Sequence, residues 1–388
     1  MEKVRFGIIG MGNMGSAHAE ILLSGKVEGA VLTAICDLDS EKFLPWKKYG
    51  LKEFNSSEEL IRSGEVDAVL VATYHYSHPD ISIDALNNGL HVFCEKPTGV
   101  YTKQVRLMNK VAQKAGKVFS SGFCLRTRKI NQKIHEIIAN GEIGEIKRIN
   151  WISTNWYRPQ SYYDSSSWRA TWAGEGGGIL LNQAPHTLDL LWYFTGLLPT
   201  KMQSNCYFGK WHDIEVEDDV TAFFEYENGA TGTLVLSTAD APGSERLEIL
   251  GNNGRLLLEG GKLTKTTLDI GEREFNATYK GGFGNPEASS EVVEVEPDEK
   301  PIHDAILQNF TNAILHGERL IAPGEEGINS LEIANAILLA SWLNEKVSIP
   351  VDEEKYLAEL NKRVATSRKK EGASVKLDLN SSLSKYKK

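Results

Sequence analysis

The sequence predicts an α/β protein in two parts: a doubly wound parallel sheet over residues 1–123, then an α+β domain over residues 124–388 with a large, mainly antiparallel open sheet. In the first third, short apolar runs alternate with segments of helical spacing, which is the rhythm of parallel βαβ units. After residue 130, β-rich runs are joined by hairpin signals such as Asn228-Gly229, which favour antiparallel pairing. The chain of 388 residues is also too long for one ordinary core.

Five strands and three helices are predicted in the first part. Residues 4–9 form an apolar run that ends in glycines, as expected of a strand buried on both faces of a parallel sheet. The other predicted strands are residues 31–36, 66–72, 91–94 and 118–123, and the predicted helices are residues 16–24, 58–63 and 79–88.

The second part mixes helices with a longer series of strands. A helix over residues 130–140 is closed by Gly141. The predicted strands are residues 146–154, 220–226, 230–237, 246–250 and 254–259, and two amphipathic helices follow at residues 302–316 and 328–344. Residues 269–299 are polar and Gly-rich, which predicts weakly packed loops or strand excursions. The Lys-rich tail from about residue 352 predicts a solvated helix around residues 356–364 and a peripheral arm.

Composition narrows the class of function. The net charge of −9 argues against a nucleic-acid partner and against an anionic membrane surface. No stretch approaches the ~20 apolar residues that span a bilayer, and the opening residues show no signal-peptide pattern. Scattered histidines and four separate cysteines predict no metal site and buried, reduced thiols. We therefore expect a cytoplasmic enzyme.

A glycine-rich loop follows the first strand and opens the first helix. In Gly10-Met11-Gly12-Asn13-Met14-Gly15, the glycines permit a tight turn, close approach to a pyrophosphate and close helix–strand packing. This is the dinucleotide-binding pattern of a Rossmann domain. Asp37 ends the second strand, where a carboxylate hydrogen-bonds the ribose and repels a 2′-phosphate, so NAD is favoured over NADP. As alternatives, Asp37 only caps a turn, or Asp39 shares its role.

Two further motifs carry candidate chemistry. Glu95-Lys96-Pro97 follows the fourth strand, at the sheet edge where such folds bind ligands, although Lys-Pro is also a common surface turn. In GGGILLNQAPHTLD, Asn182, His186 and Asp189 fall on one face of a helix predicted to begin near Asn182. Asn182 has an alternative interpretation as the N-cap of that helix.

Together these motifs resemble the Gfo/Idh/MocA family of dehydrogenases. The likeness rests on GIIGMGNMG, on AVLVATYHYSHPDISIDALNNGLHVFCEKP, on the Gly122–Arg126 junction and on GGGILLNQAPHTLDLL, and it spans nearly the whole chain. The resemblance implies that Lys96 and His186 are the catalytic pair beside the nicotinamide and the reacting carbinol. It also implies a homodimer or homotetramer that packs through the C-terminal sheet.

Position 182 departs from many family members, which carry aspartate there. Asparagine hydrogen-bonds but carries no charge, so His186 is expected to be less basic and Lys96 to take more of the base's role. The variant resembles a subgroup that includes glucoside 3-dehydrogenases. On the cofactor side, the predicted contacts beyond the glycine loop and Asp37 are Thr73, His75, His78, Glu95 and Lys96.

An aromatic segment precedes the second motif and suits a sugar ring, since aromatic faces cover apolar ring surface while polar tips meet hydroxyls. The predicted substrate contacts are Tyr157, Arg158, Trp168, Trp172 and Arg126, together with Lys96, Asn182 and His186. The alternative is a core or dimer-interface cluster. His212 and Asp213 are weaker candidates for the same cleft, and His18 and His135 are interpreted as ordinary helix residues.

The expected function is an NAD-dependent dehydrogenase that moves hydride between a nicotinamide cofactor and a secondary alcohol of a sugar, glycoside or cyclic polyol, with C3 of a glucoside preferred. His186 serves as base and Lys96 as electrostatic clamp, or the roles exchange. A second hypothesis is a redox-neutral, NAD-dependent glycosidase that oxidises C3 transiently. A third is a non-enzymatic NAD-binding regulator, which the presence of both Lys96 and His186 disfavours.

Overall fold

The N-terminal part of the chain folds around a six-stranded parallel sheet. The computed structural model describes residues 2–368 and 370. The strand order is β3-β2-β1-β4-β5-β6. The strands are β1 (Val4–Ile9), β2 (Ala30–Cys36), β3 (Lys52–Phe54), β4 (Ala68–Val71), β5 (His91–Cys94) and β6 (Phe119–Ser121). All five predicted strands are confirmed, and the short β3 was not predicted. The order reverses between β1 and β4, so their carboxyl ends open a crevice for a ligand.

Helices cover both faces of this sheet. They are α1 (Asn13–Leu23), α2 (Ser57–Arg62), α3 (His78–Asn87) and α4 (Thr102–Ala115), with 3₁₀ segments η1 (Ser40–Tyr49) and η2 (His75–Ser77). A helix from far along the chain, α9 (Ile302–His316), joins them: Phe310 packs edge-on against Phe6 and Phe93, with ring centroids 5.9 and 5.6 Å apart. Residues 302–316, which the predicted division assigned to the second domain, therefore pack on the first sheet.

A nine-stranded sheet dominates the second part, in the order β14-β13-β12-β11-β7-β10-β9-β8-β15. Only the β7–β10 pair is parallel among these described strands, so the mainly antiparallel prediction is confirmed. The strands are β7 (Ile146–Ser153), β8 (Lys201–Phe208), β9 (Glu217–Glu225), β10 (Thr231–Ser237), β11 (Glu245–Gly251), β12 (Gly254–Glu259), β13 (Lys262–Leu268), β14 (Ala288–Val292) and β15 (Val347–Ser348). The sequence did not reveal β8, because Ser204 and Cys206 stand among its inward positions and weaken the hydrophobic signal.

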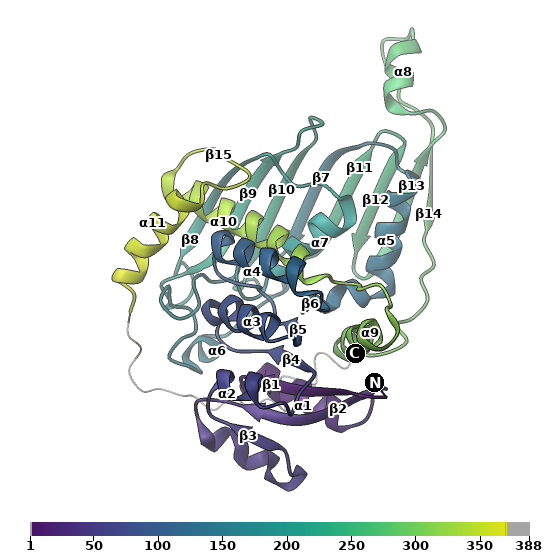
Figure 1. Ribbon diagram of the computed structural model, residues 1–388. Helices are drawn as coiled ribbons and strands as arrows, with labels where there is room; N and C mark the ends of the chain where they lie inside the picture. Colours follow the sequence, from purple (N-terminus) through teal and green to yellow (C-terminus); the bar gives the residue numbers. More distant parts are fainter. Residues whose placement is uncertain (1, 369, 371–388) are drawn as a thin grey trace.

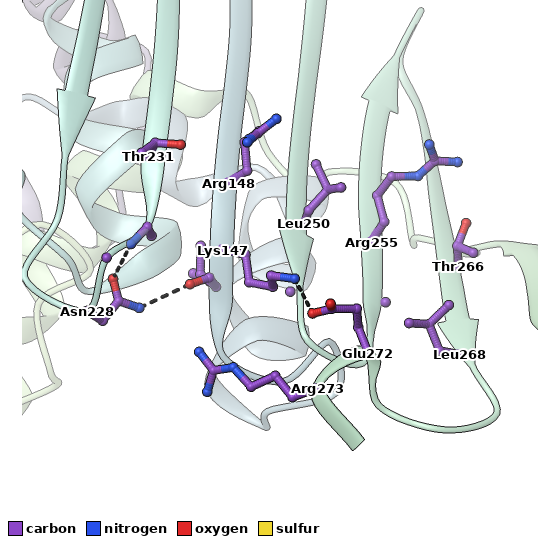
Figure 2. A pocket seen from close by; sticks show the side chains of 15 residues that line it. Lys147, Arg148, Asn228, Thr231, Leu250, Arg255, Thr266, Leu268, Glu272 and Arg273 are labelled. Carbon is purple, nitrogen blue, oxygen red and sulfur yellow. Dashed lines mark hydrogen bonds and ion pairs between the residues drawn. The ribbon is translucent and has the colours of Figure 1, made fainter. Parts of the chain in front are cut away.

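The two faces of the nine-stranded sheet differ. Three helices lie against one face: α5 (Lys129–Ala139), α7 (Pro185–Thr195) and α10 (Gly327–Leu343) (Figure 1). The other face is open and mixes apolar and charged side chains. Figure 2 shows a hollow on this face, across β10, β7, β11, β12 and β13. In this hollow Lys147 pairs with Glu272, and three arginines also line it: Arg148, Arg255 and Arg273.

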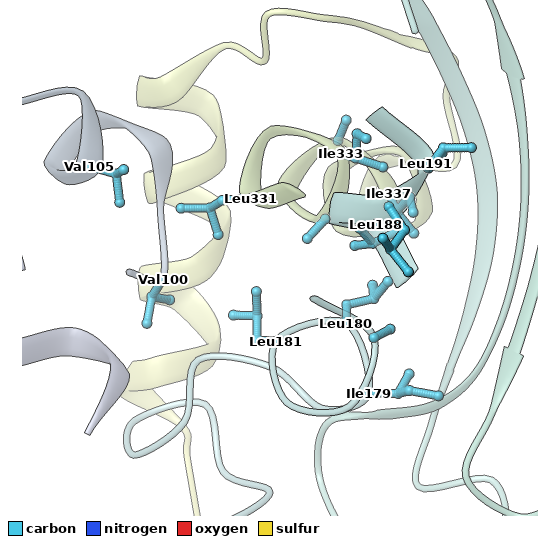
Figure 3. Close-up of a cluster of buried hydrophobic side chains, with 14 of the residues drawn as sticks. Val100, Val105, Ile179, Leu180, Leu181, Leu188, Leu191, Leu331, Ile333 and Ile337 are labelled. Atoms are coloured by element: carbon cyan, nitrogen blue, oxygen red, sulfur yellow. The ribbon is translucent and has the colours of Figure 1, made fainter. Parts of the chain in front are cut away.

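One hydrophobic core joins the two parts of the chain. In Figure 3, Leu331 of α10 lies near Val100 and Val105 of the N-terminal part, and Ile337 of the same helix lies beside Leu188 of α7. Because α10 has apolar neighbours on several sides, it is buried along most of its length. This shared core fixes the carboxyl edge of the parallel sheet against the glycine-rich turn before α7.

Smaller elements complete the described chain: α6 (Gln160–Asp164), α8 (Glu272–Thr278), α11 (Glu353–Ala365), η3 (Cys124–Thr127) and η4 (Gly324–Glu326). Between residues 269 and 299 the structure has α8 and the exposed strand β14, in agreement with weak packing there. The predicted helix near residues 356–364 is confirmed as α11, while the tail from residue 371 on lies outside the described residues. No described helix is long and apolar enough to cross a membrane.

Candidate active site

The glycine-rich loop forms a cradle at the N-terminus of α1. Gly10 adopts a φ of +96°, and a Cβ there would lie 2.6 Å from the carbonyl oxygen of Ala72. A Cβ on Gly15 would lie 1.8 Å from the carbonyl oxygen of Gly10, so the helix starts directly against the strand. A Cβ on Gly12, by contrast, would meet no atom within 4 Å beyond its chain neighbours and the backbone of its own helix. Free N–H groups and open space at a helix N-terminus fit a dinucleotide pyrophosphate, which Asn13 and Met14 of the first turn would flank.

Asp37 braces this loop from the end of β2. Its Oδ2 accepts a hydrogen bond from the Met11 N–H at 2.7 Å, and its Oδ1 accepts one from the Asp39 N–H at 3.0 Å. Asp37 therefore does cap the turn that follows β2, and its half-buried carboxylate still has lone pairs that can accept hydrogen bonds from a ribose. Asp39 is exposed and instead caps η1 by accepting the Glu41 N–H.

The loop after β4 links the cofactor side to the Glu-Lys-Pro turn. The ring nitrogens of buried His78 lie 2.8 Å from the Pro97 carbonyl oxygen and 3.0 Å from that of Thr73. His75, also buried, places Nδ1 3.1 Å from the carbonyl oxygen of Glu175 in the second part of the chain. Burial lowers the pKa of both imidazoles. These histidines hold the loop in place through contacts with three backbone carbonyls.

Glu95 is fixed by His18, which lies in α1 as predicted and also contacts the Glu-Lys-Pro turn. His18 Nε2 lies 2.7 Å from Glu95 Oε1, and both side chains are buried. Glu95 Oε2 accepts the Lys96 N–H at 3.0 Å and lies where a Cβ on Gly122 would be 2.7 Å away. Burial opposes ionisation of Glu95, but the hydrogen bond and charge of His18 outweigh it and lower the pKa to about 2.

Lys96 reaches across the crevice toward the glycine-rich turn. Its Nζ donates a hydrogen bond to the backbone carbonyl of Asn182 at 2.8 Å. Burial lowers the pKa of Lys96, and the nearby Glu95 and Glu175 oppose that change. The two motifs singled out in the sequence are thus brought together.

His186 lies in the first turn of α7, which begins at Pro185 rather than near Asn182. Proline suits that position because the missing N–H would have no helical partner there. The imidazole faces the Phe123 ring edge-on at 5.9 Å, and its Nδ1 is buried with no partner among the described residues. Burial, together with the Lys96 charge, lowers the pKa of His186 to about 3. The site thus presents a neutral imidazole with an unused hydrogen-bonding atom.

The expected helix face of Asn182, His186 and Asp189 does not form, since Asn182 precedes the helix and is not its N-cap. Asp189 instead binds Arg126 with both oxygens, at 2.8 and 2.6 Å. Arg126, a predicted substrate contact, is 1% exposed and also pairs with Glu326, so its guanidinium is held by two carboxylates.

The aromatic segment divides into a core part and a rim. Trp172, a predicted substrate contact, is 5% exposed and packs between Phe208 and Trp342, which is a core position. Trp168 lies 5.1 Å from the Tyr74 ring, beside the cofactor loop. The remaining predicted contacts, half-exposed Tyr157 and Arg158, lie at the rim with Tyr162.

His212 and Asp213, the weaker candidates, are engaged elsewhere. His212 lies between Asp218 at 3.0 Å and the Arg158 carbonyl at 2.9 Å. Asp213 pairs with Arg368 at 2.6 Å. His135 stacks on Tyr193, as an ordinary helix residue does.

Three site residues were missed by sequence reasoning. Glu175 directly precedes the three glycines, is 1% exposed and bonds the Asn182 side chain. Glu217 of β9 accepts the N–H groups of Gly178 and Leu180 and so shapes the same turn. His303 of α9 lies 3.6 Å from the Cys124 sulfur, close to His18. Only Glu175 had a local signal, because it is an acid next to the glycine motif. Glu217 and His303 come from β9 and α9, and only the fold brings them to the site.

A cradle for a dinucleotide beside a lysine–histidine pair defines an NAD(P)-dependent oxidoreductase. The chain belongs to the Gfo/Idh/MocA family: residues 4–123 match the oxidoreductase family with an NAD-binding Rossmann fold, and residues 131–257 match the GFO/IDH/MocA C-terminal domain.

Related proteins match this chain over nearly its whole length. The chain is 27% identical to myo-inositol 2-dehydrogenase of Thermotoga maritima over 359 residues, which are 90% of this chain and 99% of that one. The WlbA dehydrogenase of Bordetella pertussis, solved with NADH and UDP-GlcNAcA, superposes with a TM-score of 0.74 at 25% identity, over 90% of this chain and 100% of that one. The aldose-aldose oxidoreductase of Caulobacter crescentus, complexed with glycerol, shares the fold with a TM-score of 0.72 at 21% identity, over 89% and 100%.

Proposed function

We propose that this protein is an NAD-dependent dehydrogenase that acts on a secondary alcohol of a sugar, glycoside or cyclic polyol. One observation carries the proposal: the Lys96 side-chain nitrogen, held 2.8 Å from the Asn182 carbonyl, stands beside the neutral His186 at the carboxyl edge of the parallel sheet. Oxidation of an alcohol at that edge needs one group that takes the hydroxyl proton and another that orients the alcohol. The relatives named for inositol and for sugar substrates support the substrate class.

The choice of NAD rests on Asp37. Its carboxylate is fixed by two backbone N–H groups at the end of β2, where it would meet the ribose and repel a 2′-phosphate. When bound, the cofactor supplies the hydride acceptor. The chain's own residues supply the rest: the cradle orients the dinucleotide, and the loop of Thr73, fixed by His78, lies against Gly10 of that cradle.

We assign the proton transfer to Lys96. With a pKa of about 3, His186 is a weak base near neutral pH, although a neutral imidazole can still hydrogen-bond the substrate hydroxyl. Burial lowers the pKa of Lys96 and so raises the fraction present as the amine, the form that can take the proton when the O–H bond breaks. The ammonium so formed is stabilised by Glu95 and Glu175. Lys96 is thus the base and His186 orients the alcohol.

The rim residues fit a ring-shaped substrate. Partly exposed Arg158, Tyr157 and Trp168 offer aromatic faces and hydrogen-bond donors, which suit a carbohydrate, and Arg158 lies over the ring of Tyr162, which bonds Asn182. Because asparagine stands at position 182, we propose C3 of a glucoside as the preferred carbon. This finer assignment rests on the resemblance to the subgroup with asparagine at that position.

We also propose that two or four copies associate through the open face of the nine-stranded sheet. Ile152 and Phe223 are 39% and 38% exposed on adjoining parts of that face, flanked by the basic hollow of Figure 2. An open sheet with exposed apolar side chains is a ready surface for a second copy. Light scattering tests this against the mass of one chain, 43.0 kDa.

The decisive experiment measures NADH formation by absorbance, with NAD⁺ or NADP⁺, against a panel of glucosides, inositols and free aldoses. Turnover is expected with one sugar class and NAD⁺, and Lys96→Ala should reduce it by about 10²–10⁴-fold, the usual contribution of an acid–base group. An unchanged rate in Lys96→Ala would contradict the assignment. No turnover, with bound NAD released on denaturation, would instead favour the redox-neutral glycosidase.

A further inference from the structure

Asn182 is held by a hydrogen-bond network rather than by the helix that follows it. Its side-chain nitrogen donates to Glu175 Oε1, and its Oδ1 accepts from the Tyr162 hydroxyl at 3.2 Å. Tyr162 in turn accepts from Arg169 at 2.6 Å. Both ends of the Asn182 amide are thus fixed, and the backbone carbonyl of the same residue receives the Lys96 ammonium.

Glu175 is the only carboxylate in that network among the described residues, and it is 1% exposed. Its Oε2 accepts the Ala170 N–H at 2.5 Å, and Arg169 lies 3.8 Å from its Oε1. Ala170 has a φ of +55°, a left-handed conformation that is unusual for a residue with a side chain. A buried carboxylate that also holds a strained turn marks a site under functional constraint.

We propose that Glu175 is a positioning carboxylate for the reaction: it fixes the Asn182 amide and supplies the buried negative charge that balances the Lys96 ammonium. The inference rests on the proposed function for its role in turnover, but the charge coupling between Glu175 and Lys96 stands apart from it. Because Asn182 is neutral, the negative charge near Lys96 comes from Glu175, which is hydrogen-bonded to Asn182.

Other titratable groups surround Lys96, and they limit how far the removal of one carboxylate can change the pKa of Lys96. The groups near its ammonium are Glu95, Cys124, Glu175, Arg169, His75, His78, His186 and His303. Of the carboxylates, Glu95 is already committed to His18 and the Lys96 N–H, whereas Glu175 faces Lys96 through Asn182. Near Glu175 itself stand Arg169, Lys96, Glu217, Tyr163 and Lys370. Burial raises the pKa of Glu175, while the Arg169 charge, the hydrogen bonds from Ala170 and Asn182 and the Lys96 charge oppose that change.

The first test measures the pKa of Lys96 without turnover. Trace labelling with acetic anhydride across a pH series, followed by mass spectrometry of the Lys96 peptide, reports the pKa of that single amine. Glu175→Gln should lower it by about one unit, because a nearby opposite charge that stabilised the ammonium is gone. The matched control is Glu245→Gln, a partly buried carboxylate of β11 that bonds Trp151 and Ser153 and should leave the Lys96 pKa unchanged.

The second test moves the charge along the network. Glu175→Gln should reduce kcat/KM by about tenfold and shift the Lys96-dependent limb of the pH profile in the same direction as the labelling. The double variant Glu175→Gln/Asn182→Asp returns a carboxylate one hydrogen bond away and should recover most of both losses. A purely structural Glu175 would give lower activity, an unchanged Lys96 pKa and no rescue, which would overturn the proposal.

The two levels of inference fail separately. If no substrate is turned over by the unaltered protein but the labelling shift is found, the proposed function fails and the charge coupling holds. If the unaltered protein is active and the labelling shift is absent, the function holds and the role of Glu175 is refuted.

Discussion

The two ends of the site are built by different means. At the cofactor end, the cradle consists mainly of backbone. A Cβ added to Gly15 or to Gly10 would lie only 1.8 or 2.6 Å from a neighbouring carbonyl oxygen, and the carboxylate of Asp37 binds main-chain N–H groups. At the reaction end, the arrangement consists of buried charged side chains, Glu95, Lys96 and Glu175, each fixed by partners from distant parts of the chain.

This difference teaches where each end is vulnerable. A backbone cradle fails when a side chain is added, whatever the chemistry of that side chain, and pH has little influence on it. A cluster of buried charges tolerates changes of volume better but depends on protonation, because an unpaired buried charge is strongly disfavoured. The expectations that follow test the two ends separately, and the largest effects belong to the cofactor end.

Adding one methyl group to the cradle should abolish cofactor binding in two distinguishable ways. In Gly15→Ala the new Cβ meets the Gly10 carbonyl at 1.8 Å, so the loop must move; we expect a loss of about 3 kcal/mol in stability and more than 100-fold in NADH affinity. In Gly12→Ala the Cβ enters open space, so stability should hold while affinity falls similarly.

Urea unfolding and fluorescence titration with NADH measure the two quantities for each variant. Equal loss of stability in both variants would contradict the distinction between a glycine required by the fold and one required by the ligand. Undiminished affinity in Gly12→Ala would place the pyrophosphate elsewhere.

The cofactor end could be predicted from sequence because its determinants are local. Gly10, Gly12 and Gly15 lie within one turn, and Asp37 follows the next strand, so strand–loop–helix order alone brings them together. Most of the parallel sheet was predictable for the same reason, because strands such as β4 are short apolar runs, whereas the polar β3 was missed. The cover supplied by α9 was not, since Phe310 meets Phe6 across most of the chain.

The reaction end was only partly predictable. Lys96 and His186 were identified through motifs, but the start of α7 at Pro185 removed Asn182 from the helix and turned Asp189 toward Arg126. Local spacing could not reveal that the guanidinium of Arg126 would form a buried ion pair with Asp189. Nor could it reveal His18, whose partner Glu95 stands 77 residues later.

A smaller effect tests the specificity of the cofactor end. Asp37→Ala removes the carboxylate expected at the ribose, and we expect NADH affinity to fall about tenfold while NADPH affinity rises, because the repulsion of a 2′-phosphate is lost. Asp39→Ala is the matched control, since that exposed side chain caps η1 and should leave both affinities within about twofold. Titrations with both cofactors measure the change. An unaltered preference in Asp37→Ala would mean that Asp37 is only a brace for the loop.

The smallest effect tests the reaction end through pH. The folded pKa of His186, about 3, lies below the ordinary value of 6.5, so between these values the unfolded chain binds a proton that the folded chain does not. Stability therefore falls as pH drops below 6.5. His186→Gln removes this linkage, and between pH 7.5 and 5.5 the variant should lose about 1.4 kcal/mol less than the unaltered protein. Urea unfolding at the two pH values measures it. Equal losses in both proteins would show that His186 is not held neutral by its surroundings, and the assignment of the base to Lys96 would lose its main support.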